Sequence, residues 1–534
     1  MSSDQVDKKA TSLDKKRPLD DVDHVEDIQK SPAEEDFDNS IDDTRPSKAV
    51  WMIVLTVAMG GFLFGYDTGV ISAVLVNLGT DLGHKLSSKE QELITSITSG
   101  GALIGAIMAG LPADKYGRKF GIYFGCVLFL AGSVIQAAAY SVVQMTIGRF
   151  VVGLGVGSAA MIVPLYISEL APTKYRGRMI SFDNLSVTFG QLVSYALGAG
   201  LTHVEHGWRY MVAIGGVPPI LLAICLTWCP ESPRQLLMHR KVEEARKAIA
   251  RVYPDANEAQ VQAKMDIITY AIEYESNAVG DKSLWWQFKQ LHCVPSNLRA
   301  LISACAVMAI SQLGGFNTLM YYSATLFGLV GFTNPTAVSI TVGATNCLFT
   351  LVNMATIDRA GRRLILIITV LGMSIAMAVT AIAFHWIPVS PDLSMTEGSV
   401  NWAGILVLVA IIIYVAFFAS GVATIGWVGT ELLPLEVRAL GTMMNTVTCW
   451  GCNIIIASTF LSMMQAMTPS GAFGFYSGIC FAGWVFVIFC YPEVNGIPLE
   501  DVRQIFEHGF GVREAKKMQK ERKQQQQQQQ GGRV

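Results

Sequence analysis

The sequence predicts an all-α membrane protein with twelve transmembrane helices, and three observations lead to this prediction. Of the 534 residues, 51% are apolar and only 15% are charged, which is less charge than a soluble protein of this size usually carries. The apolar residues fall into long blocks, such as AVWMIVLTVAMGGFLFGY and ILVLVAIIIYVAFFASGVATIGW. About 20 apolar residues are enough to cross a bilayer as a helix. Twelve such blocks start near residues 50, 93, 120, 143, 180, 208, 299, 335, 364, 402, 439 and 471.

The segments outside the blocks divide the chain into five regions. Residues 1–49 carry fourteen acidic and eight basic residues without an apolar run, so we expect a disordered acidic tail. Residues 50–229 and 299–491 hold six blocks each, and residues 230–298 form a loop with charged helical pieces such as RKVEEARKAIARVY. Residues 492–534 form a second tail, with basic residues and seven consecutive glutamines near its end. This division predicts two six-helix bundles joined by short helices outside the membrane.

Matching loops recur in the two halves. DKYGRK (114–119) and DRAGRR (358–363) each follow the second block of their half, and SELAPTKYRGR (168–178) and TELLPLEVR (430–438) each follow the fourth. Such matches indicate an internal repeat. Repeated bundles favour a carrier with one site between the halves, exposed alternately to each side of the membrane.

The basic residues also predict the orientation of the chain. Lys and Arg crowd the loops after blocks two, four, eight and ten, whereas the alternate loops contain fewer. Basic loops stay in the cytoplasm, so both termini are expected there, as an even number of spans requires. Residues 1–30 are polar, so no cleavable signal peptide is expected there. We expect a multi-pass protein of the plasma membrane.

Other classes of function lack support in the sequence. The ten cysteines show no metal-ligand spacing, and neither a catalytic nucleophile nor a phosphate-binding loop is evident. GLGVG (153–157) lies inside an apolar block and is best interpreted as a helix-packing face. A channel would need a pore ring or filter, and no such element is found. We therefore expect no enzyme, no cofactor, no metal and no nucleic acid partner.

Acidic and basic side chains recur together in the repeated loops. Beside the bases that topology requires, each half carries acids, so the charges are expected to form a cytoplasmic latch between the bundles. A hydrated pair contributes about 1 kcal/mol or less, which suits a latch that must open. The alternative is that these residues only orient the chain and cap helices. The candidate latch residues are Asp114, Arg118, Glu169 and Arg178 in the first half, and Asp358, Arg362, Glu431 and Arg438 in the second.

Five separated motifs resemble one known family. GLPADKYGRK, GRFVVGLGVG, SELAPTKYRGR, PESPRQLL and PEVNGIPLE are similar to the signatures of the sugar-porter branch of the major facilitator superfamily, in the same order. Within that branch, FGYDTGVISA, VPSNLRALI and NIIIASTFLSMMQAMTPSGAF most resemble fungal myo-inositol/proton symporters. The resemblance covers about residues 50–510. It implies a twelve-helix alternating-access carrier with short intracellular helices.

Asp67 is an acid within the first apolar block, in FGYDTGV. An acid inside a bilayer costs about 2.5–3.5 kcal/mol, so it normally faces a cavity or a partner. Arg149, near the start of the fourth block, is the candidate partner. Loss of that partner would favour protonation of the carboxylate, which is the switch that proton coupling needs. The resemblance supports this reading, because proton-coupled sugar porters tend to have GYD here; the alternative is a structural ion pair in a passive carrier.

Polar side chains on apolar helices suggest a site for a neutral polyol. Amides both donate and accept hydrogen bonds, as hydroxyl groups require. The resemblance implies that the candidates match sugar-contacting positions, and that Tyr321 and Tyr322 form an external gate where their helix bends. The candidate substrate-binding residues are Gln191, Gln312, Asn317, Asn346, Trp427 and Asn453.

Three positions depart from the family pattern. Gly215 stands where some proton-coupled relatives carry a glutamate, Ser311 precedes Gln312 in place of a glutamine, and Cys449 replaces another glutamine. Myo-inositol imported with protons is the favoured interpretation, while a hexose transporter, a passive facilitator and a nutrient-sensing receptor remain open. The expected partners are the polyol, protons and the bilayer, and the protein is expected to act as a monomer.

Overall fold

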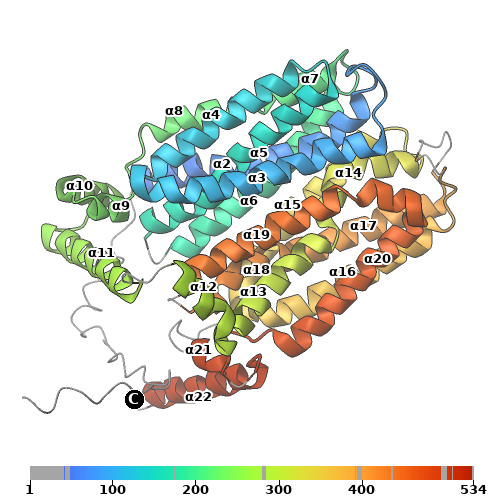
Figure 1. Ribbon diagram of the computed structural model, residues 1–534. Coiled ribbons are helices and arrows are strands. Elements are labelled where there is room, and N and C mark those ends of the chain that lie inside the picture. Colours follow the sequence, from blue (N-terminus) through green and yellow to red (C-terminus); the bar gives the residue numbers. More distant parts are fainter. Residues whose placement is uncertain are drawn as a thin grey trace, which may run out of the picture.

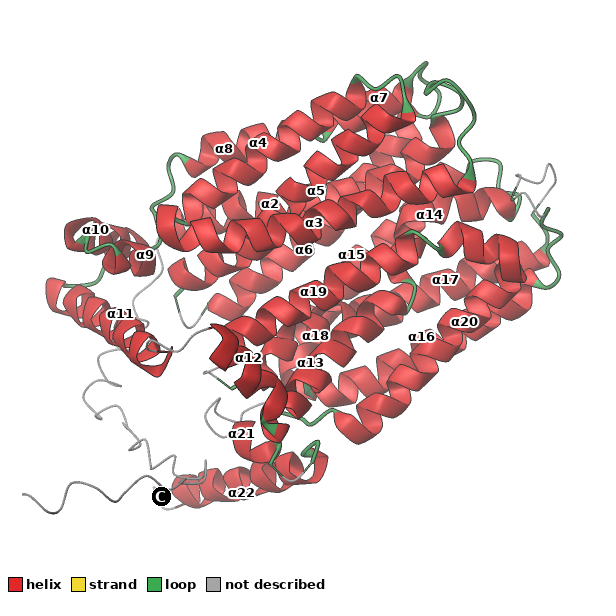
Figure 2. Ribbon diagram, viewed as in Figure 1, coloured by secondary structure: helices red, strands yellow, loops and turns green. Residues whose placement is uncertain are grey.

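The computed structural model describes residues 41, 48–172, 175–279, 284–390, 393, 400–434, 437–494, 502–507 and 509–531, and all regular structure within them is helical (Figures 1 and 2). The expected N-terminal tail lies almost wholly outside these residues. Figure 1 shows the helices of the first half above those of the second, with the connecting helices at one end. This arrangement agrees with the predicted division into two bundles and a connecting region.

The first bundle comprises seven helices. They are α2 (Lys48–Asn77), α3 (Ser88–Tyr116), α4 (Arg118–Ala137), α5 (Val142–Leu170), α6 (Arg176–Leu201), α7 (Gly207–Ile214) and α8 (Val217–Leu226). The pair α7 and α8 corresponds to a single predicted block, which is interrupted at Gly215 and Gly216.

The second bundle has the same plan with more interruptions. Its elements are α13 (Pro295–Leu313), α14 (Phe316–Leu329), α15 (Pro335–Ala360), α16 (Arg362–Phe384), α17 (Trp402–Ser420), α18 (Val422–Val428), the 3-10 helix η1 (Gly429–Leu432), α19 (Arg438–Ala457) and α20 (Phe460–Cys490). The break between α13 and α14 falls at Gly315, whose φ of 94° favours glycine. A second break lies inside α20 at Thr468, whose φ is 65°, directly before Pro469. The first part of α20 therefore extends α19, and the second part is the twelfth predicted block.

Each predicted block corresponds to a helix or to a broken pair, but not all of them are equally apolar. Ten helical stretches among the described residues are long and apolar enough to span a membrane. The other two blocks, α6 and α19, are 26 and 20 residues long and carry polar side chains such as Asp183, Gln191, Asn445 and Asn453. These two helices are less apolar because they contribute polar groups to the interior of the protein.

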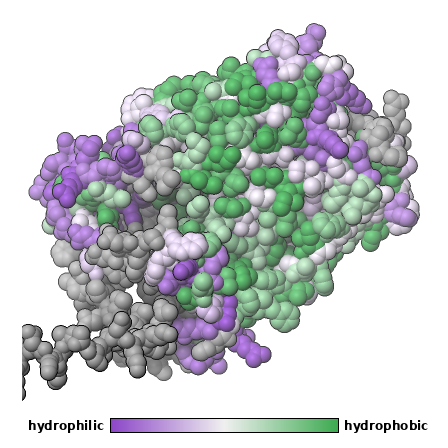
Figure 3. Space-filling model, in the orientation of Figure 1, coloured by the Kyte–Doolittle hydropathy of each residue, from purple (hydrophilic) through white to green (hydrophobic). Residues whose placement is uncertain are grey.

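The surface fits a membrane protein. Figure 3 shows a broad hydrophobic band between two hydrophilic ends. Large apolar side chains are exposed along the band, including Val127, Val134, Ile368, Ile405 and Phe489. In water such a surface would drive aggregation, whereas lipid accepts it without cost.

Glycines bring helices of the first bundle into backbone contact. A Cβ atom on Gly153 or Gly157 would overlap carbonyl oxygens of Thr98 or Ala102 on α3, so α5 and α3 pack through GLGVG. This contact confirms the predicted packing face. Gly65 on α2 meets the backbone of Val187 on α6 in the same way.

The connecting helices and the C-terminal segment lie on one side of the apolar band, which we call the terminal side (Figure 1). Its elements are α9 (Pro233–Met238), α10 (Val242–Val252), α11 (Glu258–Val279), α12 (Leu284–Cys293), α21 (Val502–Ile505) and α22 (Val512–Gly531). Arg299 at the start of α13 donates to the carbonyl oxygens of Phe506 and Glu507 at 2.8 and 2.9 Å, which fixes the C-terminal segment to the second bundle. The predicted glutamine-rich tail is helical in α22, because Lys, Glu and Gln favour helix. The other face of the band is called the opposite side.

Candidate functional site

Asp67 and Arg149 form an ion pair inside the first bundle. The Arg149 Nη1 atom donates to Asp67 Oδ1 at 2.6 Å, and only 7% of Asp67 and 1% of Arg149 are exposed. The Arg149 Nε atom also donates to the Ile94 carbonyl at 3.4 Å, so α2, α3 and α5 meet at this pair. The structure thus brings together the two residues expected to act in proton coupling.

Four candidate residues of the second bundle form one hydrogen-bond network. Asn317 Nδ2 donates to Gln312 Oε1 at 2.5 Å, and Asn453 Nδ2 approaches the same oxygen at 3.5 Å. The Tyr321 hydroxyl donates to Asn453 Oδ1 at 3.3 Å. The amide cluster thus lies on α13, α14 and α19, and α14 and α19 contact α2 and α3, the helices that meet at the ion pair.

Ser99 extends this network into the first bundle. Its hydroxyl donates to Asn453 Oδ1 at 3.1 Å, and its side chain is buried. Ser99 was not among the predicted residues, because serine is common in membrane helices. Its position in α3, two turns from the start of an apolar block, gave no distinguishing signal.

Gln191 and Asn346 form a second amide pair across the two bundles. Asn346 Nδ2 donates to Gln191 Oε1 at 2.6 Å, which joins α6 to α15. The Asn346 Oδ1 atom is buried and accepts no hydrogen bond. A buried acceptor without a donor is costly, and a hydroxyl group of a bound solute would relieve that cost.

Trp427 differs from the amides. It lies in α18 and is 42% exposed, whereas the five amide residues are buried or half-buried. The adjacent Gly426 packs against Met308 and Ser311 of α13. The structure therefore places Trp427 next to α13 on the part of the second bundle toward the terminal side.

The predicted gate tyrosines lie at a bend in α14. Tyr322 has non-helical angles (φ −121°, ψ 15°), in agreement with the expected bend. Its hydroxyl donates to the Ala457 carbonyl at 3.0 Å, and its ring stacks on Phe460 with 5.5 Å between centroids. Both tyrosines are buried, so this region is closed in the described conformation.

Hydrogen bonds between the bundles also close the opposite side. The Glu92 carboxylate of α3 accepts from Ser462 N at 2.7 Å and from Ser462 Oγ at 2.6 Å. Gln465 Nε2 donates to Ser88 Oγ at 3.0 Å beside it. Glu92 was not among the predicted residues, because it lies beside other charged residues, Lys89 and Glu90, at the start of α3.

The expected latch differs from the contacts in the structure. Arg118 Nε and Nη2 donate to the two Glu169 oxygens at 2.9 and 2.8 Å, and both residues belong to the first bundle. Arg438 donates to Leu433 of its own bundle, and Arg178 is exposed. In the described conformation Arg118 and Glu169 thus join α4 to α5 and do not bridge the bundles. The physical reason is that both helix ends belong to one bundle and carry complementary charges.

The remaining latch candidates are only partly defined. The side chains of Asp114 and Asp358 lie outside the described residues. Arg362 is half-buried at the start of α16, and Glu431 is exposed in η1.

The repeated loops match in atomic detail. Gly117 and Gly361 have positive φ angles of 102° and 83° at equivalent places. The Glu231 carboxylate accepts from the Arg118 amide at 3.1 Å, and the Glu493 carboxylate accepts from the Arg363 amide at 2.9 Å. Each half therefore uses a carboxylate to cap the helix that starts at its own repeated loop.

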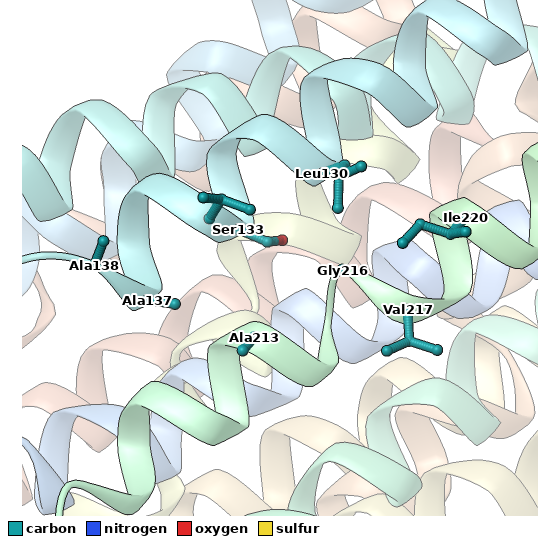
Figure 4. A pocket seen from close by; sticks show the side chains of 9 residues that line it. Leu130, Ser133, Ala137, Ala138, Ala213, Gly216, Val217 and Ile220 are labelled. Carbon is teal, nitrogen blue, oxygen red and sulfur yellow. The ribbon is translucent and has the colours of Figure 1, made fainter.

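A groove on the outside of the first bundle has a volume of about 390 Å³ (Figure 4). It lies between α4 and the pair α7 and α8, and its lining includes the exposed side chains of Val134, Val217 and Ile220. Ser133 is its one hydroxyl-bearing side chain. The groove faces lipid and is separate from the polar site between the bundles.

The fold and the site define a membrane carrier with two similar bundles, an ion pair in one of them, and amides between them. The chain belongs to the family described as Sugar (and other) transporter, which matches residues 53–506. This membership confirms the major facilitator fold and the class of transporter, as opposed to an enzyme.

Similar proteins include fungal relatives named Myo-inositol transporter 1. That of Cryptococcus neoformans var. grubii is 46% identical and covers 89% of this chain and 84% of its own. That of Saccharomyces cerevisiae is 42% identical and covers 92% of this chain and 88% of its own. These relatives support the predicted resemblance over most of the sequence.

Solved structures of the xylose transporter XylE from E. coli have the same fold. An inward open conformation gives a TM-score of 0.71 at 26% identity, covering 86% of this chain and 100% of that chain. XylE bound to 6-bromo-6-deoxy-D-glucose, described as a proton:xylose symporter, gives 0.70 at 25% identity, covering 86% and 99%.

Proposed function

We propose that this protein carries myo-inositol across the plasma membrane together with protons, by alternating access between its two bundles. The observation that carries the proposal is the Asp67–Arg149 pair, buried beside an amide network that reaches across both bundles. The relatives named as myo-inositol transporters support the substrate, and the proton:xylose symporter supports the coupling. Both termini then lie in the cytoplasm, on the terminal side, and the chain acts as a monomer.

The amides supply what a neutral polyol needs. Gln191, Gln312, Asn317, Asn346 and Asn453 offer donors and acceptors without a net charge, so a hydroxylated ring exchanges hydrogen bonds with water for equivalent bonds with the protein. The unpartnered Asn346 Oδ1 is an acceptor already desolvated and ready for a hydroxyl group. Trp427 would supply an aromatic face for the ring carbons.

Protonation of Asp67 provides the coupling. The ionised carboxylate holds Arg149, and a proton on the carboxylate removes the charge that makes this contact strong. Arg149 then interacts with its surroundings differently in the two states, so the proton changes the balance between conformations. Tyr321 connects this event to the substrate network through Asn453.

The gate and the latch act in turn. In the described conformation Tyr322 and Glu92 hold the opposite side closed. When this side opens, the charged residues of the repeated loops approach one another on the terminal side. The contacts between bundles there would be made by Asp114, Arg178, Asp358, Arg362, Glu431 and Arg438, and Arg118 and Glu169 keep the first bundle's loop in place.

The energy available is sufficient for uphill transport. One proton crossing about 100 mV releases about 2.3 kcal/mol, and one unit of pH gradient adds about 1.4 kcal/mol. At one proton per neutral solute, the sum supports roughly 500-fold accumulation.

The decisive experiment compares Asp67→Asn with the wild-type protein in proteoliposomes. The variant should lose accumulation of labelled myo-inositol driven by an imposed pH gradient, while it still exchanges myo-inositol across the membrane, because asparagine cannot carry the proton. Glucose measured in parallel tests the substrate. Unchanged accumulation in the variant would refute coupling through Asp67, and wild-type transport indifferent to pH and voltage would leave a passive carrier.

A further inference from the structure

A second carboxyl group lies within the helix bundle on α6. Asp183 is half-buried, and its Oδ1 atom is buried without a hydrogen-bond donor. Sequence analysis missed it because Asp183 falls near the start of the fifth apolar block, where an acid is easily taken for part of a loop. Unlike Asp67, which is held by Arg149, this carboxyl oxygen has no cation bound to it.

The carboxyl group is enclosed by close contact between α6 and α2. A Cβ atom built on Gly61 would lie 2.7 Å from Asp183 Oδ1, and equally close to its backbone oxygen. The absence of a side chain at Gly61 therefore leaves room for the carboxyl group against the backbone of α2. Gly61 and Asp67 are six residues apart on this helix, which places the two acids about 9 Å apart along its axis.

A polar layer between the bundles adjoins Asp183. Its neighbour Asn184 donates to Thr424 Oγ1 at 3.1 Å, and Asn353 of α15 donates to the same oxygen at 2.6 Å. The Asn353 Oδ1 atom is buried without a donor. Asn184 and Asn353 each lie seven residues from Gln191 and Asn346, toward the terminal side. Asp183 thus lies between the central site and that side.

The charged side chains described on α2, α5 and α7, which pack against α6, are engaged elsewhere. Asp67 and Arg149, on α2 and α5, pair with each other, and Glu169 at the end of α5 pairs with Arg118. Arg209 of α7 donates to the Ala137 carbonyl at the far end of the bundle.

On α15, Arg359 is exposed at the terminal end, and the side chain of Asp358 lies outside the described residues. Within the described residues, no cation is thus recorded in contact with the Asp183 carboxyl group. A carboxyl group in such a position is best accommodated in its neutral, protonated form, because an isolated charge in an apolar interior is costly.

We propose that Asp183 is a second proton-binding residue of the transport cycle, which exchanges the coupled proton between Asp67 and the terminal side. The inference rests on the proposed proton coupling. Asp183 first releases its own proton to water on the terminal side and becomes a carboxylate. A proton leaving Asp67 then restores the carboxylate that binds Arg149 and returns Asp183 to its neutral form. Asp183 would thus provide the second acid that some proton-coupled relatives have as a glutamate at the position of Gly215.

The test uses the full-length protein in proteoliposomes, with Asp183→Asn compared with the wild type and Asp67→Asn. One unit of pH gradient without a voltage drives about tenfold accumulation of labelled myo-inositol at one proton per solute. We expect Asp183→Asn to lower this ratio to about one or two, to flatten the pH profile of uptake, and to keep exchange within about twofold of wild type. Wild-type accumulation and an unchanged pH profile in Asp183→Asn would overturn the inference.

Three further variants separate coupling from folding. Asp183→Glu retains a carboxyl group and should restore the accumulation ratio and pH profile; if it restores exchange alone, the inference is wrong. Gly61→Ala should displace the carboxyl group and weaken coupling, while Gly200→Ala on α6, where the added methyl group meets open space, should not. A wild-type protein that shows no proton-driven accumulation would instead refute the proposed function itself, so the two failures are distinguishable.

Discussion

The Asp67 carboxylate and the Arg149 guanidinium are each stable inside the membrane because of the other. Removing one member of a buried pair leaves an uncompensated charge and typically costs about 3–5 kcal/mol, so Arg149→Ala and Asp67→Ala are both expected to harm the fold, whereas Asp67→Asn keeps an oxygen that accepts a hydrogen bond from Arg149. The amides differ from this pair, because they remain neutral whether or not a solute is bound. Different residues thus carry the charge that binds the proton and the neutral dipoles that bind the polyol.

Replacing Gln312 tests whether the amides bind the polyol. Gln312→Ala removes the oxygen shared by Asn317 and Asn453 and one group available to a substrate hydroxyl. A lost hydrogen bond of about 0.5–1.5 kcal/mol corresponds to a roughly 2- to 13-fold higher half-saturating concentration of myo-inositol. Initial uptake rates over a range of concentrations measure it. Gln91→Ala, at the start of α3, is the matched control, and an unchanged half-saturating concentration for Gln312→Ala would place the substrate elsewhere.

At the scale of elements, the twelve apolar blocks were predictable because a bilayer demands long apolar helices. The breaks at Gly315, Gly421 and Thr468 were not, since an interruption of one or two residues hardly changes the composition of a block. The amides of the polar network could be predicted from the sequence, but the residues that they bind could not. Ser99 and Glu92 matter only because α3 meets α19 and α20, and this contact is set by the conformation of the whole molecule.

The contact between α3 and α20 gives a second prediction. Glu92→Gln weakens the bonds to Ser462, because a neutral amide accepts hydrogen bonds less strongly than a carboxylate. A loss of about 1.4 kcal/mol would raise the population open on the opposite side roughly tenfold. A cysteine introduced at the buried Thr95 should then react about tenfold faster with an impermeant maleimide added to that side.

Glu90→Gln is the control for this measurement. Its carboxylate binds Ser87 and His84 within the same loop, so its loss should leave the bundles closed. Equal labelling of the Thr95 cysteine in all three backgrounds would contradict a role for Glu92 in closing this side.

At the scale of the whole molecule, two similar bundles contact each other through α2 and α14, α3 and α19, and α6 and α15. The family and the two-bundle plan could be predicted, because the repeated loops are recognisable in the sequence. The pairing of Arg118 with Glu169 could not be predicted from the sequence. A carrier has at least two conformations, and the charges alone do not indicate which side chains pair in each of them. The position of Asp183 could not be predicted either, because its carboxyl group packs against Gly61, which is distant in the chain.

Each half of the molecule caps the turn in its repeated loop with a glutamate of its own. Glu231 completes the turn at Gly117 and Glu493 completes the turn at Gly361, so neither half borrows its capping carboxylate from the other. Cutting the polypeptide between α11 and α12 would leave both caps intact. Two fragments produced in the same cell, ending at residue 279 and starting at residue 284, should assemble and take up myo-inositol, whereas Glu231→Ala in the first fragment should reduce the yield of the assembled pair. Co-purification through a tag on one fragment measures this directly.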